Sequence, residues 1–143
     1  MGSIDVDPAS NDMAQEWVQA GIHHSIDDDG LEHEWRGNVW LNPPYKPAQL
    51  EPFAKKLLSE IQHARVVQAC WLSPPNNLGN AAMQELMVEA SAICHHSGRV
   101  GFINSKGMAK TSAQDSAILY FGHKVGSFIS VFSQFGTVFT KGD

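Results

Sequence analysis

The sequence has few of the features that mark several classes of protein. Its 143 residues include only two cysteines, Cys70 and Cys94, which are too few for a disulfide framework and favour buried thiols in a reducing compartment. No apolar run approaches the ~20 residues of a membrane span, and the first residues lack the basic and hydrophobic regions of a signal peptide. Internal repeats and low-complexity tracts are absent too. The sequence therefore predicts a cytoplasmic protein of one compact domain, residues 1–143, with no membrane partner.

Patterns for metal binding and nucleophilic catalysis are also missing. The seven histidines include the adjacent pairs His23-His24 and His95-His96, and neighbours in sequence do not readily chelate one ion. The acidic stretch 27–29 lacks the alternating ligands and the distal Glu of a calcium loop. No phosphate loop and no Ser/His/Asp elbow is recognisable. We therefore predict no metal site.

The charge is distributed unevenly along the chain. Residues 1–45 contain nine acidic side chains and one basic one, a balance of −8, whereas residues 46–143 contain nine basic and six acidic ones, a balance of +3, which together give the net charge of −5. A mildly basic later half could contact phosphates, and we name Lys46, Arg99 and Lys106 as candidate nucleic-acid contacts. Scattered surface lysines explain the same counts. The pattern predicts weak, salt-sensitive binding at most.

Strand-like and helix-like segments alternate along the chain, which predicts a three-layer α/β domain with a mostly parallel sheet. Residues 21–35 have no period and predict a loop. In the helix expected over 48–63, the residues on the apolar face are Leu50, Phe53, Leu57, Leu58 and Ile61, and those that fall elsewhere are Lys55, Lys56 and Glu60. Strands are expected over 4–7, 38–41, 66–72, 92–94, 100–103, 116–121 and 137–139, and helices over 12–19, 48–63, 80–90 and around 128–135, the last ended by Gly136.

The most informative segment is Asn42-Pro43-Pro44-Tyr45, directly after the apolar run 38–41. The two prolines fix φ and have no N–H, so the segment forms a non-helical elbow whose carbonyls remain available as acceptors. The Asn42 side chain and the Pro43 carbonyl could both accept from one exocyclic NH₂ while Tyr45 stacks on the ring. Such a site makes an amine nucleophilic without a strong base, and the methyl of S-adenosylmethionine is a natural electrophile. A proline-rich turn after a strand is the alternative interpretation.

A second group of polar residues follows the first expected strand. Asp5 and Asp7 are two residues apart and point the same way on a strand, and the exit at Pro8 and Ala9 brings small residues close to a ligand. Solvated aspartates at a capping turn explain the same residues. Asp29 and Gly30 lie in the loop upstream of the elbow, where a solvated acidic turn is the alternative.

Three stretches together resemble the phage and prophage DNA N-6-adenine-methyltransferase family, and weaker similarity extends over most of the chain. They are Ile4-Asp5-Val6-Asp7-Pro8-Ala9-Ser10, Asp28-Asp29-Gly30-Leu31 and Trp35-Arg36-Gly37-Asn38-Val39-Trp40-Leu41-Asn42-Pro43-Pro44-Tyr45. The resemblance implies a Rossmann-like S-adenosylmethionine-dependent fold and methyl transfer to the amino group of adenine in double-stranded DNA, inside a bacterial host. It implies the catalytic residues Asn42, Pro43, Pro44 and Tyr45, and the cofactor residues Asp5, Asp7, Pro8, Ala9, Asp29 and Gly30.

The chain departs from that family in two ways. Its members carry an upstream segment with a helix before the first Asp-Pro strand, and here the chain begins at that strand, which leaves open a truncated form or a homodimer. The Gly-rich turn expected after the first strand is replaced by Ala9-Ser10-Asn11. The elbow is also shared with protein-glutamine methyltransferases. Two alternative functions therefore remain open. One is methylation of a glutamine amide in a protein, and the other is that of a non-catalytic prophage remnant that binds nucleic acid or assists assembly.

Overall fold

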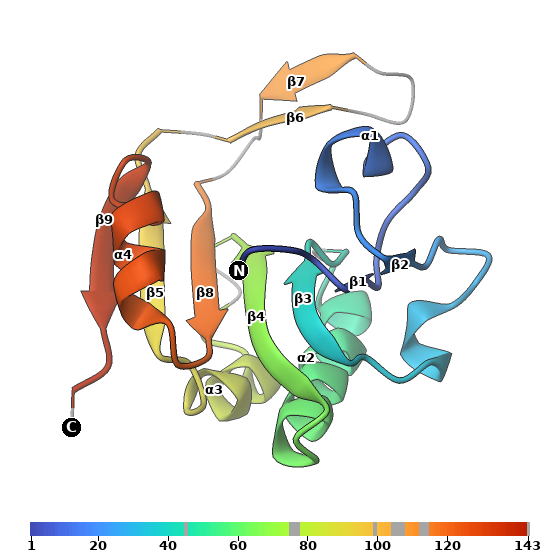
Figure 1. Cartoon of the computed structure of the whole chain (residues 1–143), viewed down its shortest axis with the longest axis horizontal. Coiled ribbons are helices and arrows are strands. Elements are labelled where there is room, and N and C mark those ends of the chain that lie inside the picture. The colour runs from blue at the N-terminus through green and yellow to red at the C-terminus, as the bar shows by residue number, and fades with distance from the viewer. Residues whose placement is uncertain (45, 75–77, 99, 104–107, 112–114, 143) are drawn as a thin grey trace.

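The computed structural model describes residues 1–44, 46–74, 78–98, 100–103, 108–111 and 115–142, and it has a seven-stranded sheet with the order β2-β1-β3-β4-β8-β5-β9 (Figure 1). The sheet consists of β1 (Val6–Asp7), β2 (Ile22–His23), β3 (Gly37–Leu41), β4 (Val66–Ser73), β5 (Ala92–His96), β8 (Ala117–Phe121) and β9 (Gly136–Thr140). A separate hairpin pairs β6 (Gly101–Ile103) with β7 (Ala109–Thr111). The helices are α1 (Gln15–Val18), α2 (Pro47–Gln62), α3 (Ala81–Met87) and α4 (Val125–Phe132), with a 3-10 turn, η1 (Gly30–Glu32).

The sheet is mixed. β1 pairs in parallel with β2 and β3, and β3 pairs in parallel with β4. β8 is antiparallel to both β4 and β5, and β9 is antiparallel to β5. The five strands β1 to β5 therefore point one way, and β8 and β9 point the other. The α/β prediction is confirmed, and the predicted mostly parallel sheet is corrected to one with as many antiparallel pairings as parallel ones.

Helices cover both faces of the sheet because its central strands are apolar on both sides. Along β4, Ala69 and Trp71 belong to the core under α2 and α3. Their neighbours Cys70 and Leu72 belong to a second core with Phe128 of α4. Figure 1 shows α4 in front of the sheet, and α2 and α3 behind it. Both cysteines are buried and unpaired, as predicted.

Several predicted boundaries change because tertiary contacts decide them. Residues 21–35, expected as a loop, contain β2 and η1, and the expected strand over 4–7 is reduced to Val6–Asp7. Helix α4 ends at Phe132, and Gly136 begins β9 instead of ending a helix. A Cβ atom on Gly136 would lie 2.0 Å from the carbonyl oxygen of His95, so glycine is needed there for the approach of β9 to β5. The strand β7 was not predicted.

The structure corrects the predicted position of Glu60, which was placed away from the apolar face of α2. Its side chain is only 1% exposed. Its carboxylate accepts from Arg65 Nε at 2.6 Å and Nη2 at 3.0 Å, from Lys56 Nζ at 3.1 Å and from the backbone N–H of Trp35 at 3.2 Å. Burial raises the pKa of this carboxyl, but the three donors outweigh it and lower the pKa to about 2. Four hydrogen bonds thus balance the cost of burying the charge.

In the part of the chain that the structure describes, no helix is long and apolar enough to cross a membrane. Among the same residues, no group of three or more His, Cys, Asp or Glu side chains could hold a metal ion.

Candidate functional site

The topology of the sheet places a crevice between the carboxyl ends of β1 and β3. The chain leaves β1 towards β2 on one side, and it leaves β3 towards β4 on the other. Neighbouring strands whose connections diverge in this way form a switch point, where open α/β sheets bind their ligands. A cavity of about 680 Å³ lies there, within the range of small-molecule sites.

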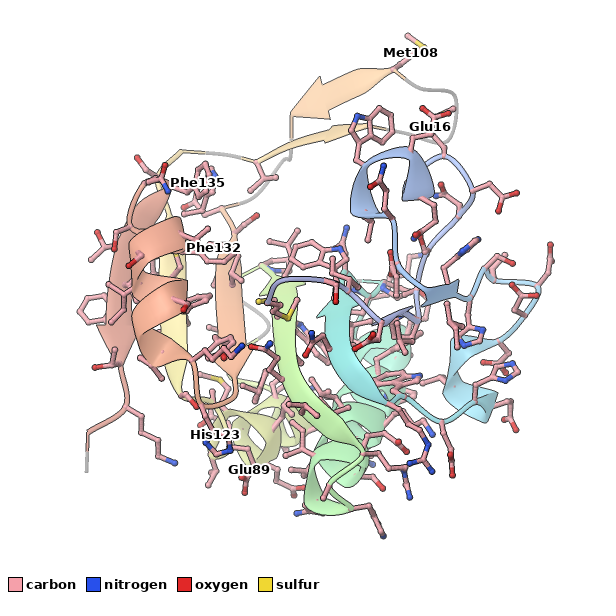
Figure 2. All side chains as sticks on the ribbon, viewed as in Figure 1. Glu16, Glu89, Met108, His123, Phe132 and Phe135 are labelled. Atoms are coloured by element: carbon pink, nitrogen blue, oxygen red, sulfur yellow. The ribbon has the colours of Figure 1, made fainter. Side chains whose placement is uncertain are left out.

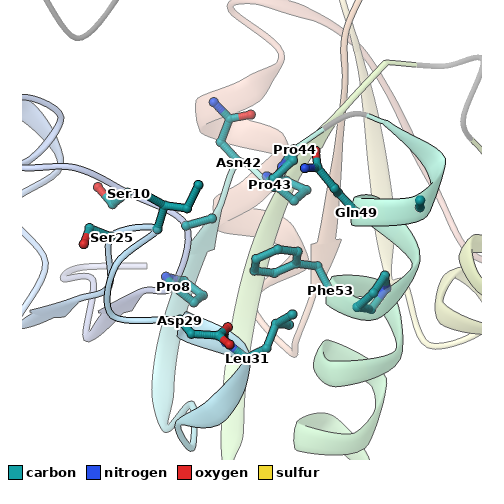
Figure 3. Close-up of a pocket in the computed structure, with 15 residues that line it drawn as sticks. Pro8, Ser10, Ser25, Asp29, Leu31, Asn42, Pro43, Pro44, Gln49 and Phe53 are labelled. Atoms are coloured by element: carbon teal, nitrogen blue, oxygen red, sulfur yellow. Dashed lines mark hydrogen bonds between the residues drawn. The ribbon is translucent and has the colours of Figure 1, made fainter.

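Four segments line this cavity (Figure 3). They are the exit of β1, the connection from β2 to β3, the exit of β3 and the first two turns of α2. The lining residues are Pro8, Ala9, Ser10, Ser25, Ile26, Asp29, Gly30, Leu31, Asn42, Pro43, Pro44, Ala48, Gln49, Pro52 and Phe53. Most are apolar, and a few polar groups are placed among them, which is typical of ligand pockets.

The predicted elbow forms the edge of the cavity at the end of β3. Pro43 is buried, Asn42 is half-buried and Pro44 is exposed. In Figure 3 the Asn42 amide lies at the opposite end of the cavity from Asp29. Tyr45 lies outside the described residues. The structure therefore brings three of the four predicted catalytic residues to the cavity.

Helix α2 begins immediately after the elbow because Pro47 occupies its first turn, where its fixed φ suits a helix. This start places Gln49 and Phe53, one turn apart, on the cavity wall. Pro52 lies inside the helix and has no N–H to donate to the carbonyl of Ala48, four residues earlier. Both residues line the cavity, so this break in the helical hydrogen bonds lies at its wall.

The aromatic wall of the cavity is fixed from behind. The Phe53 ring stacks on Trp35 with 6.2 Å between centroids and 22° between planes. Trp35 is fully buried, and its indole Nε1 donates to the carbonyl of Gly30 at 2.9 Å. Its backbone N–H donates to Glu60, so the ion-pair cluster of α2 holds the residue that supports Phe53. Phe53 therefore presents a planar surface that is held in place.

Gly30 brings two walls of the cavity into contact. A Cβ atom at this position would lie 2.0 Å from the carbonyl oxygen of Pro8, and real Cβ atoms do not approach backbone so closely. Gly30 is buried against the exit of β1. Gly30 lines the cavity, and its close approach to Pro8 gives it a structural part in the cavity wall.

Asp29 is the only carboxylate among the described residues that line the cavity. Its backbone is left-handed, with φ 49° and ψ 84°, and its side chain accepts from the N–H of Leu31 at 3.2 Å. Such a conformation costs about 1 kcal/mol or more in a residue other than glycine and concentrates at functional sites. The carboxylate is exposed at the cavity wall and available to a ligand.

The other two predicted carboxylates do not line the cavity. Asp7 is buried at the end of β1, where burial raises the pKa of its carboxyl and hydrogen bonds from Ser10, the backbone of Ala9 and Gln15 oppose that rise. Gln15 Nε2 donates both to Asp7 at 3.0 Å and to Ser10 Oγ at 2.9 Å. Asp7 thus helps to position Ser10, which lines the cavity. The Asp5 carboxylate accepts from the Asn38 N–H at 2.8 Å, at the opposite end of β1.

The loop between β2 and β3 is closed by two stacked histidines. The rings of His24 and His33 are 4.2 Å apart and nearly parallel, at 4°. His33 Nε2 lies 3.0 Å from the Asp28 carbonyl, and the Asp28 carboxylate accepts from the N–H and Oγ of Ser25 at 2.9 and 3.0 Å. Burial and the neighbouring His33 lower the pKa of His24, which Asp28 partly opposes. This loop supplies Ser25, Asp29 and the 94% exposed Ile26 to the cavity.

The predicted nucleic-acid contacts are only partly placed. Lys46 is exposed at the start of α2, directly after the elbow but outside the cavity lining. Arg99 and Lys106 lie outside the described residues. The β6–β7 hairpin between β5 and β8 lies beyond the carboxyl ends of β3 and β4 (Figure 1).

Sequence reasoning missed about half of the lining residues. Phe53 was predicted on the apolar face of α2 and not as a cavity residue. Both Gln49 and Phe53 could have been found as lining residues, because a helix that follows a ligand-binding elbow has its first turns beside the ligand. No sequence signal pointed to Ser25 and Ile26, which the histidine stack holds in place.

Comparison of the chain with protein-family models, curated proteins and solved structures finds no match. The resemblance to the phage adenine methyltransferases therefore stays a prediction.

Proposed function

We propose that this chain is an S-adenosylmethionine-dependent methyltransferase with a Rossmann-like fold, and that it methylates the exocyclic amino group of adenine in DNA. One observation carries the proposal. The cavity at the switch point of the sheet joins the Asn42-Pro43-Pro44 elbow to a planar apolar wall and to the Asp29 carboxylate. A segment suited to bind an amino group and a cavity large enough for a nucleoside therefore lie in one crevice.

The lining residues fit the chemical groups of the cofactor, which supplies a methyl group on a good leaving group. Phe53, Leu31 and Pro8 offer apolar surface for a purine ring. The Asp29 carboxylate can accept from ribose hydroxyls, and the hydroxyls of Ser10 and Ser25 are near the same wall. Asp7 acts indirectly in this proposal, because it holds Ser10 and Gln15 and does not reach the cavity.

The elbow acts on the amine. Asn42 and the Pro43 carbonyl accept from the amino group and orient its lone pair, so that alignment supplies most of the rate acceleration. Tyr45 would stack on the base. The adenine must leave the duplex to reach this site, which costs a few kcal/mol. Lys46, next to the elbow, is the described cation best placed to meet a phosphate.

A second substrate class is favoured by the charge beside the cavity. Asp27, Asp28, Asp29, Glu32 and Glu34 are all exposed in the segment that forms one wall. This acidic flank repels a phosphate backbone, and it would not repel a neutral glutamine amide in a protein. The same elbow could orient the nitrogen of that amide for methyl transfer, so methylation of a protein glutamine is the second candidate function.

The experiment begins with calorimetric titration of the purified chain with S-adenosylmethionine. We expect binding in the wild type, weaker binding in Asp29→Asn, which keeps the shape of the turn and removes the charge, and unchanged binding in Asn42→Ala. No binding at millimolar cofactor would refute the proposal and leave the non-catalytic interpretation.

Methyl transfer is then assayed on unmethylated double-stranded DNA and on a glutamine-containing protein substrate. Asn42→Ala should abolish transfer and retain the circular dichroism spectrum of the wild type. Normal turnover in Asn42→Ala would refute the role of the elbow. Transfer to the protein and not to DNA would select the second candidate.

A further inference from the structure

One flank of the sheet has no charge. Residues 125–140, which form α4 and β9, contain no Asp, Glu, Lys, Arg or His. This flank is nevertheless largely exposed, and β9 is the last strand of the sheet, at the left of Figure 1. Its large exposed side chains are Ile129 at 38%, Val131 at 49%, Phe135 at 48% and Phe139 at 58%. Figure 2 shows Phe132 and Phe135 at the upper end of this flank.

The hydrogen-bond register defines the open edge of β9. The N–H of Lys141 donates to the carbonyl of Ser91 at 3.0 Å, and the N–H of Ser97 donates to the carbonyl of Phe135 at 2.7 Å. Bonded pairs alternate along an antiparallel ladder, so Thr137 and Phe139 bond to β5. The N–H and C=O groups of Gly136, Val138 and Thr140 consequently point outward.

This edge is complementary to itself, and we infer that β9 pairs antiparallel with β9 of a second copy of the chain. A twofold axis at Val138 places Val138 opposite its own copy, and Gly136 opposite Thr140 of the partner subunit. Each of these is a bonded pair. All three outward N–H groups and all three outward C=O groups of each strand are then satisfied, which an isologous dimer requires.

The side chains support the same register. Phe139 lies opposite Thr137 of the partner subunit, an aromatic and β-branched pair of the kind that stabilises sheets. The chain carries a net charge of −5, so most of its surface repels a second copy, whereas β9 and α4 bring no charges together. Exposed uncharged edge strands without protective lysines or prolines are templates for pairing.

The pairing leaves the cavity open. Four strands, β3, β4, β8 and β5, separate β1 from β9 in the sheet. The cavities of the two copies would therefore lie at the outer ends of one continuous sheet. The inference does not depend on the proposed function.

Sedimentation velocity from about 1 μM to about 1 mM chain tests the inference. We expect the mass to rise from 15.7 kDa to twice that value, 31.4 kDa, and no further. Thr140→Pro removes an outward N–H from an exposed position and no bond to β5. By symmetry it deletes two bonds across the interface, and we expect it to raise the dissociation constant at least about tenfold.

Thr140→Val is the matched control because it keeps the N–H, and it should dimerise like the wild type. Phe139→Lys keeps the backbone and places a charge at the interface, so it should also raise the dissociation constant while its thermal unfolding stays cooperative. A wild type that remains at 15.7 kDa throughout would overturn the inference. Equal dimerisation of Thr140→Pro, Phe139→Lys and Thr140→Val would overturn it as well, as would open-ended association beyond the dimer.

Discussion

Glu60 allows a quantitative test of how the wall of the cavity is held. Its carboxylate is almost fully buried and accepts four hydrogen bonds, from Arg65, Lys56 and the backbone of Trp35. Those bonds lower its pKa from 4.5 to about 2. At about 1.4 kcal/mol per pKa unit, the difference corresponds to at most about 3 kcal/mol of stability at pH 7. Arg65 and Lys56 are 24% and 21% exposed, and solvent screening reduces the value to about 2 kcal/mol.

The direction of the pH dependence follows from the lowered pKa. The unfolded chain binds a proton at Glu60 near pH 4.5, whereas the folded chain does so only near pH 2. The contribution is therefore complete above pH 4.5 and is lost as the pH falls towards 2. By pH 3, more than half of it is gone. Glu60→Gln removes the charge and turns an NH₂ towards donors, so it loses the contribution at every pH.

The assay is urea unfolding of the wild type and Glu60→Gln at pH 7, 5 and 3. We expect Glu60→Gln to be about 2 kcal/mol less stable at pH 7, and the difference to shrink by about half at pH 3. A matched variant, Glu51→Gln, alters an exposed ion pair with Lys55 and should change stability by less than about 1 kcal/mol at any of these pH values. A Glu60→Gln difference that is the same at pH 7 and pH 3 would refute the reasoning.

Three further predictions concern the cavity loop and the cores. Gly30→Ala should destabilise the fold by about 1–3 kcal/mol in urea unfolding, because its Cβ meets the Pro8 carbonyl. The control Gly126→Ala in α4 has nothing near its Cβ and should be neutral or stabilising. An equal loss of stability in both variants would contradict this prediction. The lowered pKa of His24 means that the His24–His33 stack is complete above about pH 6.5 and is lost as the pH falls below it. The backbone amides of residues 25–33 should therefore lose protection from hydrogen exchange between pH 7.5 and 5.5, after correction for intrinsic rates. The variant His33→Phe should weaken this pH dependence. Protection that does not change with pH in the wild type would contradict the prediction. Burial raises the pKa of Cys70 to about 12 and also raises that of Cys94, so neither thiol should react with an alkylating reagent until urea unfolds the protein; rapid reaction of the native protein would count against this.

The parts of the fold that could be predicted are those whose pattern is local. Helix α2 and the strands β4 and β8 have clear apolar periods, and their predicted spans agree with the structure within one residue at each end. The elbow was found because two prolines after a strand have few structural meanings. By contrast, β2 has only two residues, and it exists because Ile22 and His24 donate to the carbonyls of Asp5 and Asp7. No local pattern encodes such pairing.

Two charged residues show where a sequence pattern does not report the position of a side chain. Glu60 lies three residues after Leu57, on the buried side of α2, but its charge led us to place it away from the apolar face. Its burial depends on Arg65 and Trp35, which a helical period does not report. Asp7 was expected to face a ligand, and it turns inward because Gln15 and Ser10 satisfy it. In both cases the partner, and not the residue type, decides the role.

The cavity and the β9 edge lie at opposite ends of one sheet, so the two proposals can be separated by experiment. Thr140 lies in β9 and Asn42 directly follows β3, and these two strands are separated by β4, β8 and β5. Distant sites without shared partners usually behave additively. Thr140→Pro should therefore leave the affinity for S-adenosylmethionine unchanged, and Asn42→Ala should leave the dimer unchanged. If dilution to the monomer also abolished cofactor binding, the central strands would have to transmit a change between the two ends. Because those strands are buried on both faces and tightly packed, we expect them to act as a rigid spacer, and the double variant to show the sum of the two single effects.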